Sequence, residues 1–464
     1  MKRKYWYAFY AVALALLPVL LFFAIQLESP TDLLAPPGLT GDKLEIQRAF
    51  EASVQDKSGI VLQYPTAGDY RSAYVLKDID GDGQDEAIVF YTLKSDESTV
   101  RVNVLDRVRE VWKSVYDEPG YGAKVISIDF DDLNKDGHME LLTCWSVFET
   151  TTAKTLTIHS VTKDEVGVLE LDALVNQSYT YRAVADMDSD GFNEVLVTWL
   201  DNTDQNLPKS YASLLKQAPD GTIAQIGQNV SLDASVSAYH SLKLETTADG
   251  KSIAFLDAYK GEDAMITEVI WWDDTERALV APLLDPDTLS NSLTLRSPAV
   301  PSMDIDKDGA MEIPIIANDG GAQVVKEVAL PLFAWSTPVF EGLSPISYGF
   351  VNTTLGCYFE VPADFKDYML AYRLSDDSCT TFYRSDDGEE RAEPLFTFLV
   401  KKNADMNESD TYTFKVVHGG MAVYGTLTSV GEAMGFTNEL IENSFTFFDT
   451  LTERGNLYEE NSCC

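Results

Sequence analysis

Short apolar runs separated by Asp- and Gly-rich loops recur along the middle of the chain. The runs Glu86–Tyr91 and Glu194–Trp199, for example, are rich in β-branched and aromatic residues. Runs of this length and composition are typical of buried strands. The pattern over residues 65–343 therefore predicts a mainly β region in which strands alternate with polar loops.

Four of these loops share one pattern, Asp-x-Asp/Asn-x-Asp-Gly-x-x-Glu. They occupy residues 78–86, 132–140, 186–194 and 304–312, which we call the first to fourth loops. The gap before the fourth loop is about twice the spacing of the others, which predicts a degenerate copy near residue 245. Residues 242–259 repeat the order strand, loop, strand without the acidic residues, so we expect this copy to bind no metal.

The loop pattern suits calcium. Ca²⁺ takes six to eight oxygen ligands, and side chains at loop positions 1, 3 and 5 converge when glycine at position 6 permits a sharp turn. Position 7 varies freely, as expected of a backbone carbonyl ligand, and position 9 is always Glu. The candidate ligands are Asp78, Asp80, Asp82, Gln84 and Glu86; Asp132, Asn134, Asp136, His138 and Glu140; Asp186, Asp188, Asp190, Phe192 and Glu194; and Asp304, Asp306, Asp308, Ala310 and Glu312. The prediction is about four structural calcium ions.

Two other interpretations of the loops are a metal-free Asx-turn and an EF-hand. An EF-hand requires an acidic residue at loop position 12. That position holds Val89, Thr143, Val197 and Ile315, and strand-like sequence follows each loop. These residues exclude the EF-hand and leave the metal-free turn as the alternative to calcium.

A period of about 55 residues holds four short strands, and units of this size stacked radially form a β-propeller. The loop pattern resembles the FG-GAP/VCBS repeats of integrin-α-type propellers over roughly residues 65–340. The resemblance implies calcium loops that each pin a turn between two strands. Five blades are expected, or six if segments near 50–75 and 325–345 complete another.

The N-terminus predicts membrane attachment. Lys2, Arg3 and Lys4 precede an apolar run, Tyr5–Ile25, that is long enough as a helix to cross a bilayer. Residues 1–26 are therefore expected to form a signal anchor of a single-pass membrane protein, with a cytoplasmic N-terminus. A cleaved signal peptide and a secreted chain are the alternative. Residues 27–64 form a tether and lead-in to the extracytoplasmic part.

The repeat ends near residue 343, and residues 344–452 predict a small α+β domain. Helical candidates at Pro362–Leu370 and Gly435–Asn443 lie among strand-like runs. The segment is similar to the small PsbP/Mog1-like domains of secreted bacterial proteins. Cys357 and Cys379 could form a disulfide or stay as two thiols. Residues 453–464 are expected to be a mobile tail.

Charge and composition narrow the range of possible functions. The 464 residues carry 35 Lys and Arg against 74 Asp and Glu, a net charge of −39. Such a surface repels a phosphate backbone, so nucleic-acid binding is excluded. Four scattered histidines and the lack of nucleophile-elbow, metalloprotease or P-loop motifs predict that the chain is not an enzyme.

Three functions remain open. The preferred one is a membrane-anchored extracytoplasmic protein that binds a protein or glycan ligand in the cell envelope, in adhesion or a related interaction. The second is an envelope assembly scaffold that acts through the C-terminal domain. The third is a carbohydrate-active enzyme that uses the face of the propeller.

Overall fold

The computed structural model describes most of the chain downstream of residue 41. The described ranges are 42–55, 59–148, 154–164, 168–204, 206–247, 250–319, 326–339, 342–353, 356–374, 379–386, 391–402, 412–418 and 421–447. The expected signal anchor (1–26) and tail (453–464) lie outside them. Among the described helices, none combines the length and the apolar character needed to cross a bilayer.

The described chain is mainly β, with six antiparallel sheets and few helices. The first sheet contains β1 (Ile60–Gln63), β2 (Tyr74–Lys77), β3 (Glu86–Leu93), β4 (Asp96–Val108) and β5 (Val111–Pro119). The second contains β6 (Lys124–Asp131), β7 (Glu140–Ser146), β8 (Lys154–Lys163) and β9 (Leu169–Tyr179). The third contains β10 (Tyr181–Ala185), β11 (Glu194–Asp201), β12 (Lys209–Gln217) and β13 (Ile223–Ser231). The fourth contains β14 (Ala238–Thr246), β15 (Ser252–Tyr259), β16 (Met265–Asp273) and β17 (Ala278–Val280).

The last two sheets exchange strands along the sequence. The fifth contains β18 (Ile313–Asn318), β20 (Leu332–Val339), β21 (Gly342–Asn352), β22 (Cys357–Glu360) and β28 (Phe445–Phe447). The sixth contains β19 (Glu327–Leu330), β23 (Met369–Leu374), β24 (Thr380–Ser385), β25 (Arg391–Lys402), β26 (Phe414–His418) and β27 (Met421–Leu427). Strand β21 therefore runs across the expected domain border at residue 343, and β19 and β28 tie the two sheets together.

The helical elements are few. They are α3 (Asp42–Ser53), a 3₁₀ turn (Ala363–Phe365), α4 (Ser429–Ala433) and α5 (Asn438–Asn443). Helix α3 packs on the first sheet through Ile46 and Phe50, which are both buried. The threonines before α4 and α5 cap these helices, because Thr428 and Thr437 accept hydrogen bonds from main-chain N–H groups of the first turns. The helix expected over 362–370 is shorter than predicted: only the 3₁₀ turn Ala363–Phe365 forms, and β23 begins at Met369.

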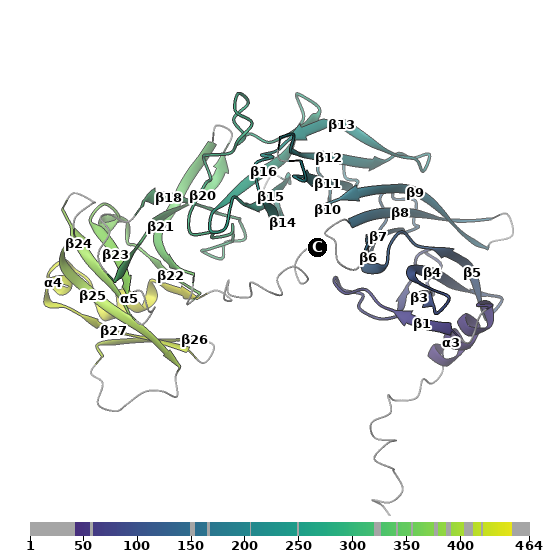
Figure 1. Ribbon diagram of the computed structural model, residues 1–464, viewed down its shortest axis with the longest axis horizontal. Helices are drawn as coiled ribbons and strands as arrows, with labels where there is room; N and C mark the ends of the chain where they lie inside the picture. Colours follow the sequence, from purple (N-terminus) through teal and green to yellow (C-terminus); the bar gives the residue numbers. More distant parts are fainter. Residues whose placement is uncertain are drawn as a thin grey trace, which may run out of the picture.

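The six sheets lie along an open arc, with the first sheet at one end and the sixth at the other (Figure 1). Each sheet shares a buried apolar layer with the next. Phe90 of the first sheet, for instance, packs against Trp145 of the second, with ring centroids 6.0 Å apart. Trp145 is fully buried and donates its indole N–H to Thr157 Oγ1 at 2.9 Å. The tryptophans Trp112, Trp145 and Trp335 are thus core residues.

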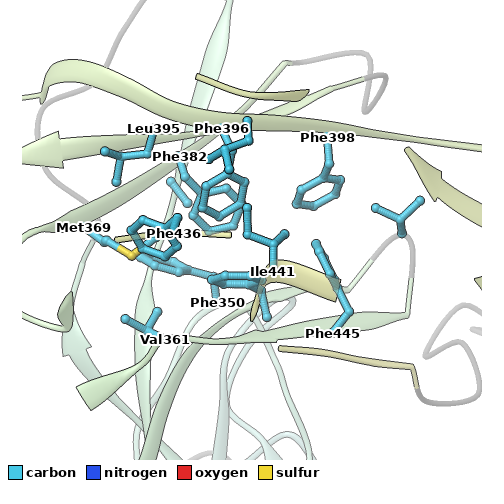
Figure 2. Close-up of a cluster of buried hydrophobic side chains, with 14 of the residues drawn as sticks. Phe350, Val361, Met369, Phe382, Leu395, Phe396, Phe398, Phe436, Ile441 and Phe445 are labelled. Carbon is cyan, nitrogen blue, oxygen red and sulfur yellow. The ribbon is translucent and has the colours of Figure 1, made fainter. Parts of the chain in front are cut away.

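A phenylalanine-rich core joins the fifth and sixth sheets. Figure 2 shows Phe382 and Phe396 of the sixth sheet stacked on each other, with their ring centroids 4.4 Å apart. Phe445 of β28 meets Phe398 edge-on, at a centroid distance of 5.1 Å. Ile441 of α5 is buried in the same cluster. This shared core explains why the C-terminal segment returns to the fifth sheet.

No disulfide joins Cys357 to Cys379. Cys357 is a buried free thiol on β22 of the fifth sheet, whereas Cys379 directly precedes β24 of the sixth. The two residues therefore do not face each other across neighbouring strands, and the disulfide alternative is corrected.

Candidate metal-binding loops

Three of the four acidic loops lie at equivalent places in their sheets, each joining two adjacent antiparallel strands. The first loop joins β2 to β3, the second joins β6 to β7, and the third joins β10 to β11. Before the fourth loop, an isolated bridge between Met303 and Glu312 takes the place of the first strand. The degenerate copy occurs where it was expected, between β14 and β15, although Ala248 and Asp249 lie outside the described residues.

All four loops share two left-handed backbone positions. The position-6 glycines have φ of 86°, 93°, 91° and 95° in chain order. Position 4 also has positive φ in each loop, with Gly81 at 72°, Lys135 at 57°, Ser189 at 58° and Lys307 at 66°. The shared left-handed residues coil the backbone so tightly that side chains at positions 1, 3 and 5 turn inward.

The position-9 glutamates are buried at the base of the loops. Their exposed fractions are 1 %, 1 %, 0 % and 0 % for Glu86, Glu140, Glu194 and Glu312. In each loop Oε2 accepts a hydrogen bond from the position-2 N–H, at 2.9, 3.0, 2.9 and 2.9 Å in the same order. Position 2 is always apolar and buried, as Ile79, Leu133, Met187 and Ile305. The glutamate and this apolar residue therefore anchor the loop to its sheet.

The aspartates use part of their hydrogen-bonding capacity within the loop. The position-1 Oδ2 accepts from the position-6 glycine N–H at 2.9, 3.0, 2.8 and 3.0 Å. The position-5 Oδ1 accepts from the position-7 N–H at 2.8, 2.8, 3.0 and 2.8 Å. These bonds hold Asp-rich turns in shape, and each carboxylate keeps further lone pairs for a cation.

Three loops gather carboxylates closely enough for a metal ion. One oxygen from each member lies within 4.8 Å of the others in the sets Asp78, Asp80 and Glu86; Asp186, Asp188 and Glu194; and Asp304, Asp306 and Asp308. The second loop forms no set of three carboxylates among the described residues; its position 3 is Asn134, whose amide oxygen is also a type of calcium ligand. The position-7 side chains differ in chemistry, and His138 Nδ1 lies 3.7 Å from Asp136 Oδ1.

Burial and the neighbouring carboxylates both raise the pKa of the position-9 glutamates. Burial, reinforced by the neighbouring aspartates, raises the pKa of Glu86 to about 8 and that of Glu312 to about 7. The same two causes raise the pKa of Glu140 to about 7. A cation between the carboxylates would reverse this effect, because opposite charge favours the ionised form.

Neighbouring loops contact each other from sheet to sheet. Met139 N donates to Ile79 O at 2.8 Å, which joins the second loop to the first. Asn193 Nδ2 donates to Asp131 at 3.0 Å, and Met311 N donates to Glu245 Oε2 at 2.8 Å. The conformation of each loop therefore affects how its sheet packs on the next.

Gly81 shows how close this approach is, and Gly81→Ala is expected to destabilise the protein more than Gly83→Ala. Both residues have positive φ, which costs an L residue roughly 1–2 kcal/mol. A Cβ on Gly81 would lie 2.5 Å from Gly137 O, whereas one on Gly83 meets nothing within 4 Å. Chemical denaturation of both variants should separate them by about 1 kcal/mol or more. Equal losses would contradict a tight contact between the two loops.

The protein supplies a different partner to each of the first three loops. Lys163 of β8 reaches back to Asp80 Oδ2 of the first loop at 2.9 Å. Gln217 of β12 donates to Glu140 Oε1 of the second loop at 3.0 Å. Lys216 contacts three carboxylates of the third loop. The sequence pattern missed these partners, because they lie on other strands and only the strand register reveals them.

Comparisons with known proteins identify no family for the chain. No protein-family model matches it, and no curated protein matches it. Similar solved structures include a Lactobacillus plantarum protein (10 % identity, TM-score 0.27, covering 72 % of this chain and 84 % of that one). An endo-arabinase from Bacteroides thetaiotaomicron has 12 % identity and TM-score 0.25 and covers 63 % and 98 %. Rhamnogalacturonan lyase YesW has 11 % identity and TM-score 0.27 and covers 72 % and 74 %.

These names correct one prediction. The sequence predicted that the chain is not an enzyme, yet an endo-arabinase and a rhamnogalacturonan lyase are among the structures similar to it. That prediction is therefore withdrawn. At TM-scores of 0.25 and 0.27 the two matches assign no activity to this chain, so enzymatic activity is a question for direct assay.

Proposed function

We propose that the chain is a calcium-stabilised β-propeller of the FG-GAP/VCBS type that binds a protein or glycan of the cell envelope. The first five sheets would be its blades. Residues 1–26 would anchor it in the cell membrane and leave the rest extracytoplasmic. The calcium ions would hold the turns that set each sheet against the next, and so keep the binding surface in shape.

One observation carries the metal part of this proposal. Glu312 is fully buried, its Oε2 accepts the Ile305 N–H at 2.9 Å, and its Oε1 has neither a hydrogen-bond nor an ion-pair partner among the described residues. A buried carboxylate oxygen without a partner costs free energy. Glu312 lies at the base of the cluster formed by Asp304, Asp306 and Asp308. A hard divalent cation among these carboxylates would give that oxygen its partner.

The donor set favours calcium among the common cations. Every side-chain donor is a carboxylate or amide oxygen, whereas zinc sites use Cys and His. Mg²⁺ demands near-ideal octahedral geometry and keeps several waters, so a loop that offers many protein oxygens suits Ca²⁺ better. The residues present therefore fit the ion that the repeat pattern predicts.

The test is a thermal melt of the full-length protein, purified in detergent, in chelator, magnesium and rising calcium. Preferential binding to the folded state raises the midpoint as the ligand exceeds its Kd. We expect a calcium-specific rise, and Glu312→Gln should weaken it because the variant lacks one anionic oxygen. Glu97→Gln, which changes an exposed glutamate, is the matched control and should leave the rise intact. No shift in calcium would refute the metal part of the proposal.

The binding part needs its own assay. Calcium-loaded protein should bind an envelope polysaccharide or protein fraction reversibly and without turnover, as measured by co-sedimentation and product release. Release of sugar fragments from arabinan or rhamnogalacturonan would replace the binding proposal with an enzymatic one. Binding that persists in chelator would separate recognition from the calcium sites.

A further inference from the structure

Lys216 places a positive charge in the middle of the third loop. Its Nζ lies 2.6 Å from Asp188 Oδ2, 2.7 Å from Asp190 Oδ2 and 2.7 Å from Glu194 Oε1. Glu194 is fully buried, and the Lys216 side chain is only 19 % exposed. A calcium ion takes its oxygens at about 2.3–2.6 Å, so an ion bound to these three carboxylates would fall on the position of the ammonium. Lysine and metal therefore exclude each other here.

The other loops lack this lysine at the corresponding position. Val195 pairs with Leu215, so Lys216 is the residue opposite Glu194 on the third strand of its sheet. Continuing the register by one residue in the same way identifies the equivalents in the other sheets. They are Asp106 opposite Glu86, Ser160 opposite Glu140, and Thr337 opposite Glu312. Opposite its position-9 glutamate, the first loop thus has a carboxylate, whereas the second and fourth loops have a hydroxyl.

Lys163 does not do the same for the first loop. Its Nζ contacts Asp80 at 2.9 Å and comes from the neighbouring sheet, while Asp78 and Glu86 share a close carboxylate set with Asp80. Asp106, which is 7 % exposed, adds a further negative charge beside Glu86. One lysine against the carboxylates of the loop and of Asp106 leaves the first loop strongly anionic.

We propose that Lys216 is a built-in cation that replaces calcium in the third loop, so that this loop holds its turn without metal while the other three take calcium. The inference rests on the proposed function, because it presupposes calcium in the remaining loops. It predicts three bound ions where the loop pattern alone predicts about four. The third sheet, at the centre of the five, would then keep its turn when calcium is scarce.

Equilibrium dialysis of calcium against the full-length protein, with a chelator-treated baseline, tests the count. We expect three ions per chain for the natural protein and four for Lys216→Ser, which copies the residue of the second loop. The reciprocal variant Ser160→Lys should lose one ion, giving two. Lys163→Ser is the matched control, because it also removes a lysine from an acidic loop and should leave the count at three.

Thermal melts give a second readout for the same variants. In chelator, Lys216→Ser should melt below the natural protein, because Glu194 loses its buried partner; in calcium most of this loss should be restored. Four ions in the natural protein, with no gain in Lys216→Ser, would overturn the inference and leave the proposed function standing. No calcium bound by either protein would overturn both. If Lys216→Ser fails to fold in chelator, the loss of one ion in Ser160→Lys decides the question.

Discussion

Arg296→Met is expected to lower the free energy of unfolding by about 3–5 kcal/mol, because it leaves a buried carboxylate without its counter-ion. Arg296 and Asp257 form an ion pair in which both side chains are 0 % exposed, with Nη2 3.2 Å from Oδ1. Methionine retains the apolar stem of the side chain and lacks the guanidinium. The loss therefore combines the missing charge and hydrogen bonds with the small space that the guanidinium leaves in a fully buried site.

The guanidinium and the carboxylate are the centre of a larger buried network. Arg296 also donates to Thr267 Oγ1 at 2.8 Å and to Thr294 O at 2.9 Å, and it contacts Val300 O. Asp257 accepts from Ser302 N at 3.0 Å and from Ser302 Oγ at 2.9 Å. Burial lowers the pKa of Arg296 to about 10, although the carboxylate opposes the shift. The network fastens the segment after the fourth sheet to the strand β15.

Urea unfolding followed by tryptophan fluorescence measures this loss. Arg384→Met is the matched control, because Arg384 pairs with Asp386 at 2.6 Å on the surface, where the side chains are 42 % and 68 % exposed. Exposed pairs contribute about 0–1 kcal/mol. The double variant Arg296→Met with Asp257→Asn should recover part of the stability, since it removes the unpaired charge and keeps a side-chain oxygen for the Ser302 donors. Similar losses at positions 296 and 384 would contradict the assignment.

The structural features that the sequence predicted are those that depend on residues close together along the chain. Strands on both sides of the first three acidic loops, the strand after the fourth, the turn at glycine and the degenerate copy between β14 and β15 all follow from local spacing. Each of these features is encoded within a few residues of itself.

Features that depend on long-range pairing could not be predicted. Strand β19 joins the sixth sheet and β28 joins the fifth, and neither pairing leaves a local signature. Lys216 is 22 residues beyond Glu194 in the sequence, and only the β11–β12 register places the two opposite each other. The sequence suggested a helix that continues to residue 370, but the pairing of β23 with β19 and β24 makes Met369 and Leu370 part of a strand instead.

A second buried carboxyl makes stability depend on pH. Glu268 of β16 is 1 % exposed and accepts hydrogen bonds from Asp233 N at 2.9 Å and Asn291 Nδ2 at 3.2 Å. Burial raises its pKa to about 7. Burial would also raise the pKa of the adjacent Asp233, but hydrogen bonds from Lys260 and Ser235 outweigh it and lower that pKa to about 2. The two carboxyls thus titrate far apart, and only Glu268 changes charge near neutral pH.

We expect Glu268→Gln to be more stable than the natural protein at pH 8 by about 3 kcal/mol, and to match it near pH 4 apart from a constant offset. Between the unfolded pKa of about 4.5 and the folded pKa of about 7, the folded state binds more protons than the unfolded state. The stabilising contribution of Glu268 is therefore complete below pH 4.5 and is lost as the pH rises through 7. Each pKa unit corresponds to about 1.4 kcal/mol, which gives the stated difference. Glutamine stays neutral throughout and removes this loss.

Urea unfolding from pH 4 to pH 8, with the natural protein and the variant under identical conditions, checks this prediction. The difference between variant and natural protein isolates Glu268 from every other titrating group. Glu97→Gln should give a difference that does not change with pH. A flat difference for Glu268→Gln as well would mean that the buried carboxyl keeps its charge in the folded state, with Lys260 and Asn291 supplying enough stabilisation to offset its burial.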